Sequence, residues 1–168
     1  MNSEPKDLIV LGVIKHGIKK FDKIQKVVQI ESDELNSILE KLENRGFISV
    51  QEKKGWFGIK IEIIPTEKGS NEVDEGIQKL QDKWNQMSLI YKTGDKEKLK
   101  QQMDENRSLF PTMMFFGVMD MMMFSMMFSM MGITMSEYIP ADDIPEMNGG
   151  NMDESSIDEG GFDIDIGF

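Results

Sequence analysis

The sequence predicts a mainly α-helical protein with one small β-hairpin, and three observations predict it. Apolar residues recur at helical spacing in several stretches between residues 9 and 135. A period-two alternation with one apolar face runs through residues 57–64. Residues 1–110 hold 19 basic and 19 acidic residues and are neutral, whereas residues 111–168 hold 11 acids and no base, so the net charge of −11 belongs to that end.

Three helical patterns open the chain. The apolar residues of the first two lie at helical spacing: Ile9, Leu11, Ile14 and Ile18, then Phe21, Ile24, Val27 and Val28. The third pattern has an apolar stripe made of Leu35, Ile38, Leu39 and Leu42. Its ends are well marked, because Ser32 is a good N-cap and Gly46 can adopt the left-handed conformation that ends a helix.

A β-hairpin is expected next, with strands over residues 47–52 and 57–64. In the second strand Phe57, Ile59, Ile61 and Ile63 alternate with other residues, which indicates one buried face. The intervening Lys-Lys-Gly at 53–55 is predicted to be the hairpin tip. Pro65 ends the second strand, and Thr66 is placed to cap a further helix.

Three helices, a hairpin and a further helix in this order follow the plan of a winged helix-turn-helix domain, expected over residues 1–70. Residues 39–48 (LEKLENRGFI) resemble the recognition-helix ending of MarR/PadR-like winged-helix regulators. Residues 65–69 (PTEKG) resemble the motif after their wing, with Pro65 replacing the usual leucine. The resemblance implies that the third helix enters a major groove and that the wing touches backbone or minor groove. Winged helices also serve as protein-binding modules.

Lysines around the third helix are the candidate contacts to double-stranded DNA. The predicted DNA-binding residues are Lys19, Lys20, Lys23, Asn36, Ser37, Lys41, Lys53 and Lys54. Asn36, Ser37 and Lys41 could read base edges, and the other lysines would contact phosphates. Three carboxylates on the same helix surface oppose this, and the alternative is a solvated lysine face without a ligand. Trp56 and Phe57 are either hairpin packing residues or a contact for a partner.

Residues 71–110 are expected to form a dimerisation helix and a second helix. Six apolar residues spaced 4, 3, 4, 3 and 4 form a heptad seam: Val73, Ile77, Leu80, Trp84, Met87 and Tyr91. We predict that Ile77, Leu80, Trp84 and Met87 join two copies in a homodimer, as this segment does in the resembling regulators. The alternative is that the helix folds back onto its own winged helix. A break at 93–95 separates it from a helix over 96–109, which Pro111 ends.

Methionine dominates the next segment, since residues 113–135 hold 11 of the 16 methionines. We expect one apolar helix over 111–136. It is long enough to span a bilayer, but Asp120 inside it and the weak insertion tendency of methionine argue against a membrane span. Three alternatives remain: a helix buried in the dimer, an adaptable surface for a hydrophobic protein segment or a small apolar effector, and a Cu(I) site, which the missing cysteines disfavour.

Residues 137–168 are expected to be a disordered acidic tail. Near its end Phe162, Ile164 and Ile166 alternate with Asp163 and Asp165, as a strand added to a sheet edge would need. The alternative is a solubilising tail with incidental apolar residues. The tail could also screen the lysine face by mimicking phosphate charge.

Composition limits the function classes. The chain has no cysteine, and His16 is its single histidine, so we expect no disulfide, no metal site, no cofactor and no enzymatic activity. The first residues are polar and show no signal peptide, so a cytoplasmic location is expected. The favoured function is a dimeric, DNA-binding transcriptional regulator. The second is a protein-binding adaptor or chaperone-like factor that holds hydrophobic segments with the methionine-rich helix.

Overall fold

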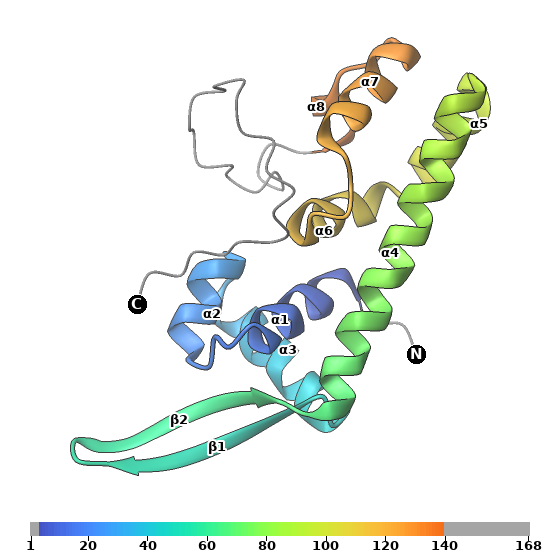
Figure 1. The fold of residues 1–168 in the computed structure, drawn as a ribbon. Coiled ribbons are helices and arrows are strands. Elements are labelled where there is room, and N and C mark those ends of the chain that lie inside the picture. The colour runs from blue at the N-terminus through green and yellow to red at the C-terminus, as the bar shows by residue number, and fades with distance from the viewer. Residues whose placement is uncertain (1–3, 140–168) are drawn as a thin grey trace, which may run out of the picture. The chain divides into compact units, whose positions relative to one another are not determined.

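The structure, a computed structural model, describes residues 4–139 and is mainly helical with one antiparallel hairpin (Figure 1). The chain divides into two compact units, residues 1–79 and 80–168. Helix α4 (Glu67–Thr93) begins in the first unit and ends in the second. Among residues 4–139, no helix is both long and apolar enough to cross a membrane.

The first unit follows the predicted element order. It contains α1 (Pro5–Lys15), α2 (Phe21–Val28), α3 (Ser32–Asn44), β1 (Ile48–Gly55), β2 (Gly58–Pro65) and the start of α4. The predicted apolar stripes form its core, in which Leu11, Ile14, Ile24, Leu35 and Leu42 are fully buried. Burial of one stripe from each of α1, α2 and α3 in a single core is what fixes the three helices against each other.

The C-terminal end of α3 agrees with the sequence prediction, whereas its N-terminal end differs from it. Gly46 has a φ of +75° as predicted, and its N–H donates to the Glu43 carbonyl at 2.9 Å. Phe47 N–H donates to the Leu42 carbonyl at 2.9 Å, which completes the helix ending. Ser32 is not the N-cap: it is the first helical residue and Glu31 holds the cap position without a side-chain bond.

The start of α4 closes the base of the hairpin. Thr66 Oγ1 accepts from the Gly69 N–H at 3.0 Å, which confirms the predicted cap, and donates to the Gly46 carbonyl at 2.6 Å. A Cβ at Gly69 would lie 2.0 Å from the Phe47 carbonyl oxygen. The glycine is therefore required by this close approach of helix and strand.

The hairpin is longer than predicted and its tip lies elsewhere. The ladder runs from Ile48 opposite Pro65 to Gly55 opposite Gly58, so the tip is Trp56-Phe57 and the predicted tip at 53–55 is wrong. Glycines on both sides, with Gly58 at a φ of +120°, allow this two-residue turn.

The predicted buried face of the second strand is also largely wrong. Ile63 is 4% exposed, but Ile61 and Ile59 are 57% and 62% exposed. The physical reason is that the hairpin extends beyond the helices of its unit, as Figure 1 shows, so only its base reaches the core.

The second unit contains the end of α4, then α5 (Lys96–Glu105), a 3-10 turn η1 (Arg107–Leu109), α6 (Phe110–Phe116), α7 (Met121–Met131) and α8 (Met135–Tyr138). The predicted helix over 96–109 thus ends at Glu105. Pro111 does not end a helix but lies in the first turn of α6, where its missing N–H costs nothing.

The methionine segment is three helices and not the predicted single one over 111–136. Gly117 and Gly132, with φ of +64° and +71°, end α6 and α7. Asp120 is the N-cap of α7, where Oδ1 accepts from the N–H groups of Met122 at 2.9 Å and Met123 at 3.1 Å. Asp120, the charged residue that disfavours a membrane span, is therefore the residue at which α7 begins.

An aromatic cluster forms the core of the second unit. The ring of Phe124 lies 5.0 Å from that of Phe110, 4.8 Å from that of Phe128 and 6.2 Å from that of Trp84, all edge-on. The same unit also holds fully buried sulfur-containing and aliphatic side chains: Met87, Leu99, Met103, Met113 and Met127. Part of the methionine-rich segment thus supplies core, while most of its methionines are partly or fully exposed.

The heptad seam of α4 is buried within one chain. In the first unit Val73 is buried, and a Cβ at Gly76 would lie 2.6 Å from a methyl of Leu8. Ile77, also in the first unit, is half-buried, and Leu80, Trp84 and Met87 in the second unit are buried. The alternative that the helix folds back onto its own winged helix fits Val73, whereas Trp84 packs against Phe124 of the second unit.

The predicted acidic tail lies outside the described residues from 140 onward. Its predicted first residues do not fit the expectation, because Glu137 and Tyr138 belong to α8 and Tyr138 is buried.

Candidate nucleic-acid interface

One face of the hairpin carries a cluster of lysines around a single carboxylate. Because side chains alternate along a strand, the register places Lys53, Lys60 and Glu62 on one face. Lys53 Nζ lies 2.9 Å from Glu62 Oε2. The Lys53 ammonium holds the pKa of Glu62 below its usual range, and the charges of Lys19 and Lys60 act in the same direction.

Lys19 reaches this face because the chain before α2 is tied to β2. The Ile63 N–H donates to the Lys19 carbonyl at 2.8 Å, which holds the α1–α2 connection beside the strand. Lys19, Lys53 and Lys60 around Glu62 form what we name the lysine cluster, with a net charge of +2 from three ammonium groups and one carboxylate. The cluster can hold an anionic group such as a phosphate.

The other predicted lysines lie near the cluster in sequence but not all on its face. Lys20 is exposed at the N-cap position of α2, and Lys23 is exposed in the first turn of that helix. Lys54 is exposed, but the register places it on the opposite face of the hairpin from Lys53. Lys60 also belongs to the cluster.

The outward surface of α3 is polar and acidic. Asn36 and Ser37 are exposed, as base-reading residues would need to be. Asp33 and Glu40, which follow the same stripe at helical spacing, are exposed as well. This surface therefore offers hydrogen-bonding groups for base edges but adds negative charge beside them.

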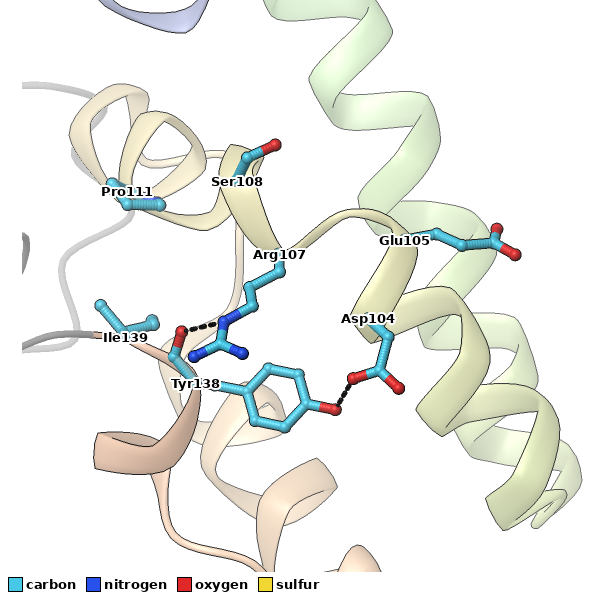
Figure 2. Close-up of a pocket in the computed structure, with 7 residues that line it drawn as sticks. All are labelled: Asp104, Glu105, Arg107, Ser108, Pro111, Tyr138 and Ile139. Atoms are coloured by element: carbon cyan, nitrogen blue, oxygen red, sulfur yellow. Dashed lines mark hydrogen bonds between the residues drawn. The ribbon is translucent and has the colours of Figure 1, made fainter.

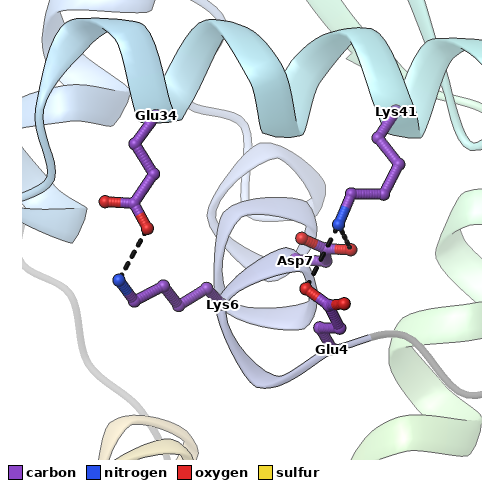
Figure 3. Close-up of polar contacts among 5 residues, drawn as sticks. All are labelled: Glu4, Lys6, Asp7, Glu34 and Lys41. Atoms are coloured by element: carbon purple, nitrogen blue, oxygen red, sulfur yellow. Dashed lines mark hydrogen bonds and ion pairs between the residues drawn. The ribbon is translucent and has the colours of Figure 1, made fainter.

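Lys41 forms ion pairs with two carboxylates of its own unit. Its Nζ lies 2.9 Å from Asp7 Oδ2 and 3.2 Å from Glu4 Oε2, and both carboxylates belong to the start of α1 (Figure 3). These hydrogen bonds, the one to Asp7 above all, raise the pKa of Lys41. The predicted base contact of Lys41 would require its release from Asp7, a carboxylate with 1% exposure.

Apolar side chains are exposed over the other face and the tip of the hairpin. Val50, Ile59 and Ile61 lie on one face of the ladder, and Trp56 and Phe57 at the tip are fully exposed. We name these five residues the apolar hairpin surface. Trp56 and Phe57 therefore do not pack against the hairpin, and their contact with a partner stays a prediction.

A pocket of about 520 Å³ lies in the second unit, between α5, η1 and α8 (Figure 2). The Tyr138 hydroxyl donates to Asp104 Oδ1, and Arg107 donates from Nε to the Tyr138 carbonyl at 2.9 Å and from Nη2 to the Glu137 carbonyl at 2.7 Å. Burial, and then the bond to Asp104, raises the pKa of Tyr138 to about 12. These groups hold α8 in place by bonding one another.

The methionines leave a small exposed patch on α7. Met122 and Met126, one helical turn apart, are 63% and 47% exposed, whereas Met113, Met127 and Met103 are fully buried. A surface for hydrophobic protein segments in this region would be built on Met122 and Met126.

Comparison with protein-family models, with curated proteins and with solved structures finds no match to this chain. The function therefore has to be argued from the site itself. Two features of it escaped the sequence analysis although signals for them exist. Glu62 alternates with Lys60 in the predicted strand, which indicates a shared face, and Asp120 directly precedes a methionine run, which is typical of an N-cap.

Proposed function

We propose that this chain is a winged-helix protein that binds duplex DNA through its first unit. The observation that carries the proposal is the lysine cluster, in which Lys19 from the α1–α2 connection and Lys53 and Lys60 of the hairpin all act on the carboxylate of Glu62, with the Lys19 backbone bonded to β2. Cations from separate elements on one surface are what contact with a phosphate backbone requires. The order of α1, α2, α3, hairpin and α4 supports the winged-helix assignment.

In this proposal the lysines supply affinity and α3 supplies limited base reading. Lys20, exposed beside Lys19, extends the cationic surface toward α2. Asn36 and Ser37 would meet base edges, while Asp33 and Glu40 would repel phosphates and keep α3 from contacting the backbone closely. The expected binding is therefore strongly dependent on salt and weakly dependent on sequence.

The test is duplex binding at several salt concentrations with a charge-reversal variant. Lys19→Glu, Lys53→Glu and Lys60→Glu together should abolish binding at moderate salt, or reduce the slope of log affinity against log salt by about 0.9 for each lost phosphate contact. The matched control reverses Lys96, Lys98 and Lys100, three exposed lysines of α5, and should bind as the native chain does. Equal binding by both variants would refute the assignment.

A homodimer joined through the heptad seam of α4 stays a prediction. Leu80, Trp84 and Met87 are already buried within one chain, so a seam between two copies would require α4 to release them. The adaptor function is supported by the methionine segment, in which Met122 and Met126 are exposed and six further methionines are partly exposed. We favour DNA binding because the lysine cluster is a charged site with a defined ligand chemistry, whereas the exposed methionines are distributed over α6, α7 and α8.

A further inference from the structure

The outer edge of β2 has main-chain groups placed for another strand. The Ile63 N–H donates to the Lys19 carbonyl, so the backbone of Ile63 points away from β1. Backbone groups alternate in direction along an antiparallel strand, so the backbone groups of Ile61 and Ile59 point the same way. Within residues 4–139 the sheet has two strands, β1 and β2, and no strand lies beside Ile59 and Ile61. Such an edge is a template for strand addition.

The two faces beside this edge differ in chemistry. On one face lie Ile59 and Ile61, both more than half exposed. On the other lies Lys60, with Lys19 near enough to act on the same carboxylate, Glu62. A strand that fits this edge needs apolar side chains on one face and carboxylates on the other, and hence an alternation of the two.

Residues 162–166 of this chain, Phe-Asp-Ile-Asp-Ile, have that alternation. They belong to a segment, residues 140–168, with nine Asp and Glu and no Lys or Arg, which complements the lysines in charge. The 22 residues between Ile139 and Phe162 can span up to about 75 Å when extended. That reach is several times the radius of about 15 Å expected for a compact domain of this length.

We propose that residues 162–166 add to the outer edge of β2 of the same chain. Phe162, Ile164 and Ile166 would then extend the apolar face formed by Ile59 and Ile61. Asp163 and Asp165 would lie on the face of Lys60 and Lys19, where they neutralise part of the lysine cluster. A consequence that rests on the proposed function is competition, because DNA phosphates and these two carboxylates use the same lysines.

Hydrogen exchange on the full chain tests the docking without DNA. Ile164→Asp with Ile166→Asp removes the alternation, and Ile144→Asp with Ile157→Asp adds the same charge to the same acidic segment outside it. The amides of Ile59 and Ile61 should exchange at least about tenfold faster in the first variant than in the native chain or the control. Equal rates in all three proteins would overturn the proposal.

Two further measurements test which copy of the chain supplies the added strand and which face of that strand meets the lysines. Protection of Ile59 and Ile61 that is lost on dilution would mean that the segment comes from another copy, which contradicts docking within one chain. Lys60→Glu should reduce the protection of Ile59 and Ile61. In that background Asp163→Lys with Asp165→Lys should restore it. Failure to restore the protection would overturn the assignment of the two carboxylates to the lysine face. If hydrogen exchange shows no docking but DNA binding remains salt-dependent, the docking proposal is wrong and the proposed function is unaffected.

Discussion

The hairpin and the seam of α4 both have regularly spaced apolar residues, but those of the outer hairpin are exposed and those of the seam are mostly buried. Ile59 and Ile61 follow a regular period of two, yet both are more than half exposed. Leu80, Trp84 and Met87 follow a regular heptad spacing and are buried under the aromatic cluster of their own unit. A periodic pattern therefore predicts which side of an element is apolar, but not whether the cover lies within the same chain.

The difference indicates where this molecule meets other groups. An apolar face that its own chain covers is core, and changes there should alter stability. An apolar face that the described residues leave open, beside a lysine cluster, is where we propose that contacts form. The substitutions below compare the two regions, from the largest expected effect to the smallest.

Truncation of the central aromatic residue of the second unit should have the largest effect. Phe124 is fully buried and touches the rings of Phe110, Phe128 and Trp84. Phe124→Ala should lower the free energy of unfolding by about 3–5 kcal/mol, measured by urea denaturation. Met122→Ala, two residues before it but 63% exposed, should change it by less than about 0.5 kcal/mol. Similar losses for both would contradict the difference in burial between the two faces of α7.

Within the hairpin, the base and the outer part should respond differently. Ile63→Ala should cost about 2–5 kcal/mol of unfolding free energy because the side chain is 4% exposed. Ile61→Ala, on the same face of the same strand but 57% exposed, should cost clearly less. A cost for Ile61 equal to that for Ile63 in thermal melts would show that the outer hairpin is core, and the comparison would fail.

A side chain at Gly69 tests the closure of the hairpin by α4. Gly69→Ala places a Cβ 2.0 Å from the Phe47 carbonyl oxygen, a backbone atom, and should cost about 1–3 kcal/mol. Gly55→Ala is the matched control, because its Cβ would make an ordinary contact of 3.7 Å with the Gly58 carbonyl. Chemical denaturation of the two variants should give a clear difference, and equal stability would disprove the close approach.

The smallest effect concerns Tyr138, and it appears only at high pH. Its pKa in the folded chain is about 12, against about 10 for an unfolded tyrosine. The raised value means that its contribution to stability is complete below pH 10 and is lost as the pH rises from about 10 to about 12. In a Tyr91→Phe variant, where Tyr138 is the remaining tyrosine, phenolate absorbance should rise with a midpoint near 12. A midpoint near 10 with the helices intact would refute the buried bond to Asp104.

The sequence predicted most elements of the first unit, because local signals dominate there. Gly46 and Thr66 mark helix ends by chemistry that acts within four residues, and both predictions hold. The hairpin tip was misplaced because Lys-Lys-Gly and Gly-Trp-Phe-Gly both allow a turn, and the ladder register decides between them.

Predictions that depend on long-range packing were less successful. The prediction of a single methionine helix was wrong because Gly117 and Gly132 end α6 and α7 in left-handed conformations, and the prediction rested on composition alone. The engagement of Lys41 by Asp7, 34 positions earlier, follows from the packing of α1 on α3, which no local pattern contains. The lysine cluster was predicted in part, since its lysines lie among those expected to contact phosphates but the central Glu62 was not identified.

The most direct test of the contrast between hairpin and seam is acrylamide quenching of the two tryptophans, one in each region. A Trp56→Phe variant reports Trp84, which is 5% exposed, and a Trp84→Phe variant reports Trp56, which is fully exposed. We predict that Trp84 stays shielded and Trp56 stays accessible over a dilution of about a hundredfold, because burial within one chain does not depend on concentration. A Trp84 signal that becomes quenchable on dilution would contradict this, since it would show that a second copy covers the seam.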